Sequence, residues 1–62
     1  MENRIKLIRA KTGLSQMKFA EVYHIPMRTL QDWEREVRTP PEYVVELLEF
    51  RVNFDLKSEK LY

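Results

Sequence analysis

The apolar residues of this chain recur at the intervals of three and four residues that an amphipathic helix requires. A first helix is predicted to begin at residue 2 or 3 and to end at Thr12, and its inward-facing residues are Ile5, Leu7 and Ile8. Gly13, the only glycine, follows at once. Because glycine accepts a positive φ without a Cβ clash, this position predicts the end of the helix.

Two short helices are predicted within residues 14–35. The first covers residues 16–23, and Ser15 is placed to cap its free backbone N–H groups. Pro26 cannot continue that helix but suits the first turn of another, which should begin near Met27. The apolar residues that should close over a shared core are Leu14, Phe19, Ala20, Val22, Tyr23, Ile25, Leu30 and Trp33. The other side of each helix is polar and free to contact a partner.

A further helix is predicted over residues 41–52. The preceding residues favour a helix start, with Thr39 as N-cap, two early prolines and Glu42 at the third position of a capping box. Apolar residues occupy more of this helix than one packing face can use, so the surplus should meet a partner. The predicted interface residues are Tyr43, Val45, Phe50, Val52 and Phe54. Apolar and polar residues alternate at the start of residues 53–62 as they would in a strand, yet a helix is equally allowed there.

The length of 62 residues allows one domain, residues 1–62, with a small core. Association with a second copy is the expected way to add to that core. The chain has no cysteine, which excludes disulfides and thiolate metal sites and fits a reducing compartment. No apolar run approaches the roughly 20 residues that span a bilayer, and the first residues lead into a helix instead of a signal sequence. A cytoplasmic protein is therefore expected.

The sequence offers little for catalysis or for binding a cofactor. It has no glycine-rich phosphate loop and no Ser/His/Asp set with room to assemble. His24, the single histidine, has no cysteine or second histidine beside it, so a metal site is not expected. We expect neither an enzyme nor a cofactor-binding protein.

The net charge of +1 is low for a nucleic-acid-binding protein, but it is unevenly distributed. Residues 1–38 hold eight Lys/Arg and five Asp/Glu, a balance of +3, whereas residues 39–62 hold three and five, a balance of −2. The basic excess therefore lies in the part of the chain that includes the two short helices.

Residues 14–35 resemble the helix-turn-helix of the Cro/phage-repressor class of bacterial regulators. The matching positions, in order and without gaps, are Leu14, Ser15, Gln16, Ala20, Thr29, Trp33, Glu34 and Arg35. The resemblance covers roughly residues 5–48 and is specific in the two short helices. His24 stands where the family usually has a glycine, which predicts a positive φ at that residue. Pro26 stands where the family usually has a Ser or Thr cap.

The resemblance implies an all-α fold of four to five helices, like the lambda repressor DNA-binding domain. The second short helix would then read DNA bases through Met27, Arg28, Gln31 and Asp32. Arginine can donate two hydrogen bonds to guanine, and glutamine can form two with adenine. A carboxylate can accept a hydrogen bond from the amino group of cytosine, and methionine can contact the methyl group of thymine. Asp32 also lies four residues after Arg28, a spacing that lets it orient the arginine.

Other residues would contact the DNA backbone or support the reading helix. The phosphate-contact candidates are Gln16, Lys18, Arg35 and Arg38. Arg9 and Glu34 match a family pair that forms a partly buried salt bridge between the first and third helices. Leu30 and Trp33 are expected in the core beneath the reading helix.

The function that the resemblance implies is sequence-specific binding of double-stranded DNA by a small bacterial or phage transcriptional repressor. A homodimer would bind a pseudo-palindromic site. Two alternatives stay open. The chain could be an antitoxin that autoregulates through the same domain while the helix over 41–52 or residues 53–62 bind a toxin. It could also be a protein-interaction module that kept the fold without DNA binding, which Asp32, Glu36 and the low net charge favour.

Overall fold

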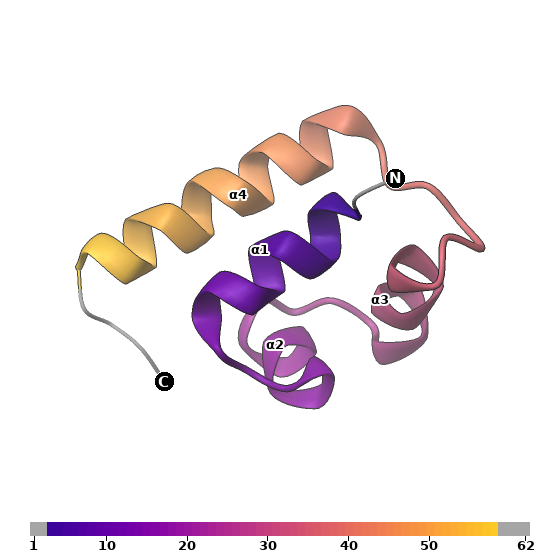
Figure 1. Cartoon of the computed structure of the whole chain (residues 1–62), viewed down its shortest axis with the longest axis horizontal. Helices are drawn as coiled ribbons and strands as arrows, with labels where there is room; N and C mark the ends of the chain where they lie inside the picture. Colours follow the sequence, from indigo (N-terminus) through magenta and orange to yellow (C-terminus); the bar gives the residue numbers. More distant parts are fainter. Residues whose placement is uncertain (1–2, 59–62) are drawn as a thin grey trace.

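The computed structural model describes residues 3–58, which form four helices and no strands. The helices are α1 (Arg4–Thr12), α2 (Gln16–Val22), α3 (Met27–Glu34) and α4 (Glu42–Lys57). Figure 1 shows α1 between α4 on one side and the α2–α3 pair on the other. The prediction of an all-α fold is therefore confirmed. None of the helices in residues 3–58 combines the length and apolar character needed to cross a membrane.

The ends of α1 and α2 follow from local sequence. Asn3 caps α1, because its side-chain oxygen accepts the backbone N–H of Lys6 at 3.0 Å. Gly13 ends α1 with a φ of 73°, as predicted. Ser15 caps α2 by accepting the backbone N–H of Lys18 at 3.1 Å, also as predicted.

The turn between α2 and α3 depends on a histidine with a left-handed backbone. His24 has a φ of 57°, which confirms the prediction for this position. The N–H of the next residue, Ile25, donates to the carbonyl of Ala20 at 2.9 Å and so satisfies a carbonyl that the end of the helix leaves free. Glu36 ends α3 through the same type of turn with a φ of 62°, which the sequence did not predict.

The four helices close over one hydrophobic core. Its buried apolar residues are Ile5, Ile8, Phe19, Ala20, Leu30, Val45 and Val52. Leu14, Tyr23, Ile25 and Trp33 pack against this core and are partly buried. Leu7 was predicted to face inward, but it is about half exposed. Leu7 lies about 200° around the helix from buried Ile5, so it is on nearly the opposite side of α1.

α4 differs from its prediction at both ends. It begins at Glu42 after Pro41, without a side-chain cap, so the prediction of Thr39 as its cap is wrong. A residue followed by proline is held away from helical backbone, which keeps Thr39 and Pro40 outside the helix. α4 then continues to Lys57 instead of ending near residue 52, because Val52 and Leu56 extend its packed face. Residues 53–58 are therefore not a strand, and residues 59–62 of the predicted tail lie outside the described residues.

Replacing Gly13 tests the backbone stop after α1. No atom lies within 4 Å of the position a Cβ would take, so only the positive φ opposes a side chain. Gly13→Ala should lower the free energy of unfolding by about 1 kcal/mol, and Gly13→Asn should lower it less because asparagine tolerates this conformation better. Urea denaturation of both variants measures the difference. Equal losses would show that the backbone conformation is not the cause.

Candidate nucleic-acid interface

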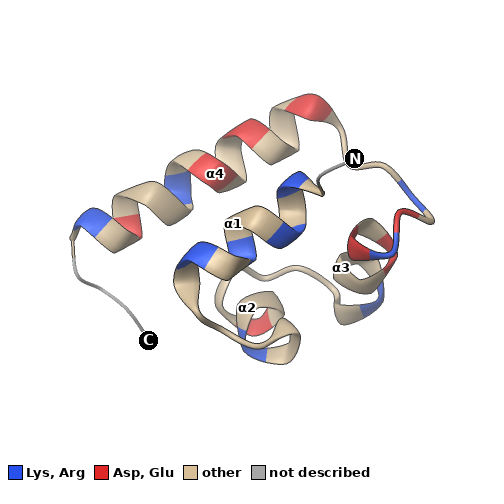
Figure 2. Ribbon diagram, viewed as in Figure 1, with Lys and Arg blue, Asp and Glu red and all other residues tan. Residues whose placement is uncertain are grey.

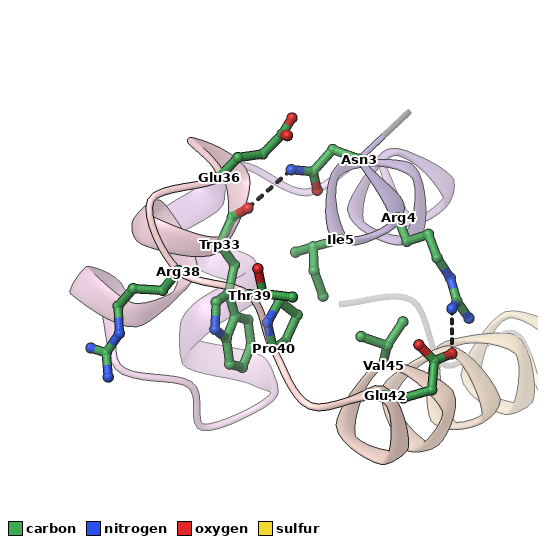
Figure 3. A pocket seen from close by; sticks show the side chains of 10 residues that line it. All are labelled: Asn3, Arg4, Ile5, Trp33, Glu36, Arg38, Thr39, Pro40, Glu42 and Val45. Carbon is green, nitrogen blue, oxygen red and sulfur yellow. Dashed lines mark hydrogen bonds and ion pairs between the residues drawn. The ribbon is translucent and has the colours of Figure 1, made fainter. Parts of the chain in front are cut away.

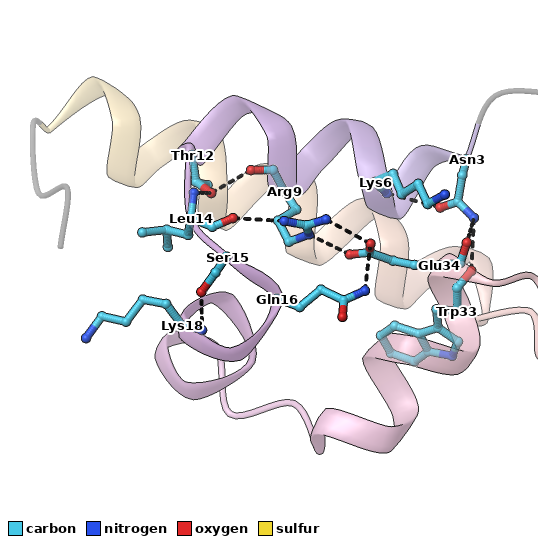
Figure 4. Close-up of polar contacts among 10 residues, drawn as sticks. All are labelled: Asn3, Lys6, Arg9, Thr12, Leu14, Ser15, Gln16, Lys18, Trp33 and Glu34. Carbon is cyan, nitrogen blue, oxygen red and sulfur yellow. Dashed lines mark hydrogen bonds and ion pairs between the residues drawn. The ribbon is translucent and has the colours of Figure 1, made fainter.

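A buried carboxylate joins the first three helices. Glu34, at the end of α3, accepts two hydrogen bonds from Arg9 of α1, from Nε at 2.7 Å and from Nη2 at 3.0 Å. It also accepts the Nε2–H of Gln16, at the start of α2, at 3.1 Å. Arg9 reaches further and donates to the carbonyl of Leu14 at 2.9 Å. Arg9, Gln16 and Glu34, called here the Glu34 network, are shown in Figure 4. Arg9 and Glu34 thus form the pair that the sequence predicted.

The Glu34 network keeps its charges at neutral pH. Burial is the largest influence on Glu34 and opposes ionisation, but hydrogen bonds from Arg9 and Gln16, together with nearby positive charge, outweigh it. The pKa of this carboxyl therefore lies below its ordinary value. The hydrogen bond to Glu34 likewise raises the pKa of Arg9 above its ordinary value, against the effect of burial. The result is a fully charged pair with little access to water.

Asn3 adds a second tie between the start of α1 and the end of α3. Its side-chain amide donates to the carbonyl of Trp33 at 2.9 Å (Figures 3 and 4) and to that of Glu34 at 3.3 Å (Figure 4). These carbonyls belong to the last turn of α3, which lacks partners within the helix. This role of Asn3 was not predicted from the sequence. A helix-capping asparagine was the available signal, but its second set of bonds depends on the packing of distant helices.

The inner side of α3 is seated in the core. Leu30 is fully buried, and Trp33 and Met27 pack against the core while remaining partly exposed. Phe19 of α2 and Tyr23, which follows this helix, stack at a tilt with ring centroids 4.9 Å apart. Leu30 and Trp33 therefore support α3 from beneath, as expected. Met27 was expected to point outward, but part of its surface is used in packing.

The outer side of α3 presents arginine around a buried acid. The side chain of Arg28 is 82% exposed, whereas that of Asp32 is only 8% exposed. Asp32 accepts a hydrogen bond from Arg35 at 3.0 Å and lies 3.7 Å from Nε of Arg28. The expectation that Asp32 faces outward is therefore wrong, because its carboxylate is buried and bound to Arg35 within the protein. Gln31 is partly exposed beside them.

The four phosphate-contact candidates differ in whether their side chains already have partners within the protein. The amide nitrogen of Gln16 already donates to Glu34. Lys18 is exposed and pairs with Glu21 at 3.1 Å, an exposed ion pair that a competing anion can replace. Arg35 and Arg38 are also exposed, and in Figure 3 the side chain of Arg38 points away from the other side chains drawn. Their contacts with phosphate stay predictions.

Arg4, Arg9 and Lys11 of α1 form ion pairs within the protein. Figure 2 shows basic bands along α1 and acidic bands along the neighbouring α4. Arg4 pairs with Glu42 and Glu49, and Lys11 pairs with Glu49, so these charges bridge the two helices. Arg28, Arg35 and Arg38 share no such row of acids. The low net charge therefore coexists with a cluster of exposed arginines at α3 and the loop after it.

α4 presents an apolar surface on its outer side. Tyr43, Phe50 and Phe54 of the predicted interface are exposed, but Val45 and Val52 are buried in the core, so their assignment to an interface is wrong. Leu47, which the prediction omitted, is 64% exposed. The helix is apolar around so much of its circumference that its periodicity alone did not separate the core side from the outer side.

Comparison of the chain with models of known protein families, with curated protein sequences and with solved structures returned no match. The site is therefore interpreted from its own geometry.

Removing Arg9 should destabilise the fold strongly. Arg9→Ala leaves the buried carboxylate of Glu34 without its main partner, and we expect the free energy of unfolding to fall by about 3 kcal/mol. Arg4→Ala is the matched control, because Arg4 is an α1 arginine whose ion pairs with α4 are exposed to water. Urea denaturation at neutral pH measures both. Losses of similar size would contradict a special role for the Glu34 network.

The pH dependence of stability gives a second test. Because the pKa of Glu34 is lower in the folded chain than the roughly 4.3 of an unfolded glutamate, its contribution is complete above that value and is lost as the pH falls through the folded pKa. Glu34→Gln should therefore be less stable than the wild type at about pH 7, with a shallower loss of stability on acidification. Denaturation curves over a pH series measure this. An equally steep acid loss in both proteins would refute it.

Proposed function

We propose that this protein is a small bacterial or phage transcriptional repressor that binds double-stranded DNA in a sequence-specific manner. In this proposal α2 and α3 act as a helix-turn-helix, and α3 enters the major groove with its outer side toward the base edges. The proposal extends the resemblance of residues 14–35 to the Cro/phage-repressor class.

The observation that supports the proposal most is the arrangement of two exposed arginines around buried Asp32. Arg28 and Arg35 both approach this carboxylate, which limits the conformations their long side chains can adopt. Two arginines against one acid leave a net positive charge at the surface of α3. Guanidinium groups held in this way suit guanine edges and phosphate oxygens, since less side-chain freedom is lost on binding.

The rigidity of α3 supports the same reading. Its inner side is held by Leu30 in the core, and its last turn is held by Asn3 and by the Glu34 network. Base recognition requires side chains at fixed positions, which a helix tied at its end and along one side can provide. We assign base contact to Arg28 and Gln31 with an apolar contribution from Met27, and we assign to Asp32 the positioning of Arg28.

Binding to DNA should depend steeply on salt and on particular arginines. In a gel-shift titration the logarithm of the affinity should fall linearly with the logarithm of the salt concentration, because phosphate contacts release counterions. Arg28→Ala should cost about 1–3 kcal/mol of binding to a selected site and relax preference at one base position, whereas Arg38→Ala should weaken all sequences alike.

Lys11→Ala removes a cation of α1 whose ion pair with Glu49 is exposed to water, away from α3. It is the control for these variants and should bind as the wild type does. Equal effects of Arg28→Ala and Arg38→Ala on selected and random DNA would show that the roles are wrongly assigned. No shift even at low salt would remove DNA binding and leave a protein-interaction module as the better description.

A further inference from the structure

The outer side of α4 carries a continuous row of apolar side chains. Its members, called here the α4 seam, are Tyr43, Leu47, Phe50 and Phe54, with exposed fractions of 66%, 64%, 73% and 51%. Among the described residues no other helix exposes so many large apolar side chains. Exposed apolar rows of this kind mark interaction surfaces.

The spacing of the α4 seam is that of a coiled coil. Its members follow one another at intervals of four, three and four residues, which is the d-a-d-a pattern of a heptad repeat. Val45 and Val52 then fall at position f, diametrically opposite the seam, and both are buried in the core. α4 therefore packs against its own chain with one side and presents a heptad seam with the other.

We propose that the partner of this seam is a second copy of the chain, with the two α4 helices side by side and parallel. Charges beside the seam support this choice. Glu46 occupies position g, and Arg51, five residues later, occupies position e of the next heptad. In a parallel pair these two positions face each other across the interface, so Glu46 of each copy meets Arg51 of the other, twice by symmetry. Arg51 holds Asp55 of its own chain through Nε, and its Nη groups would meet the partner's carboxylate. The seam is thus complementary to itself in its heptad spacing and in its charges.

An antiparallel pair would lose this match. There, g positions face g positions and e positions face e positions, which puts the two Glu46 side chains on one edge near Asn53. Arg51 would then face Val44, which offers no charge. The spacing of opposite charges therefore favours the parallel arrangement.

The α4 seam is already ordered before association. Asp55 accepts hydrogen bonds from Tyr23, which follows α2, at 2.9 Å and from Arg51 at 3.2 Å. α4 also pairs with Arg4 and Lys11 of α1. A free peptide with two heptads would have to pay for helix formation on binding. In the folded chain α4 is already helical, so most of the free energy of the apolar contact can contribute to association.

A parallel dimer also suits one DNA duplex. With the two-fold axis along α4, equivalent residues of both copies lie at the same height along the axis. Figure 1 shows α3 on the side of the molecule where α4 begins, so both α3 helices would lie at the same end of the dimer. This orientation rests in part on the proposed function, whereas association itself is measurable without DNA.

Sedimentation equilibrium without DNA tests the association. The wild type should have twice the 7.6 kDa mass of one chain at high concentration, and Phe50→Glu should have the mass of one chain. Met17→Glu is the matched control, because Met17 of α2 has the same 73% exposure but lies outside the seam, and it should remain dimeric. Circular dichroism should show unchanged helix content in both variants. A monomeric wild type, or a dimeric Phe50→Glu, would overturn the proposal.

Single cysteines test the orientation, since the natural chain has none. In a parallel pair Leu47 meets Leu47 of the other copy, so Leu47→Cys should form a covalent dimer under mild oxidation. In an antiparallel pair Leu47 meets Phe50, so only a mixture of Leu47→Cys and Phe50→Cys would cross-link efficiently, and that result would overturn the parallel arrangement. A dimer that forms and cross-links but shifts no DNA would leave this inference intact while refuting the proposed function.

Discussion

The ion pair of Glu34 with Arg9 is the constraint on which the arrangement of this protein depends. A carboxylate that is 2% exposed is costly unless its oxygens are fully used, and Glu34 uses them on two bonds from Arg9 and one from Gln16. These three residues come from α3, α1 and α2. One buried acid therefore fixes the relative positions of three helices in a chain too short to have a large core.

The fixed inner side of α3 determines what its outer side can do. Because Leu30 and the Glu34 network hold the helix, its exposed arginines are presented from a rigid support. Glu42 and Glu49 of α4 are paired with the α1 cations Arg4 and Lys11, on the other side of α1 from α3. The molecule thus separates an arginine surface at α3 from an apolar surface on α4, and the proposals assign DNA to the first and a second copy of the chain to the other.

Features decided by neighbouring residues were predictable from the sequence, and features decided by packing were not. Gly13 and Pro26 act locally, so the end of α1 and the start of α3 were predicted correctly. Asp32 was taken for an outward base contact because its burial beside Arg28 and Arg35 depends on the packing of the folded chain. The predicted interface included Val45, which is buried, and omitted Leu47, which is exposed. The sequence could not separate them, because only the position of α1 decides which side of the apolar α4 faces the core.

Selection of bound fragments from a random pool of double-stranded DNA tests the central claim most directly. A rigid α3 presented twice by a symmetric dimer should enrich a pseudo-palindrome whose half-sites are about 34 Å apart, one turn of the duplex. Within each half-site a guanine should recur where Arg28 reaches the major groove. A pool that stays random after repeated rounds at low salt would contradict the claim that the outer side of α3 reads DNA.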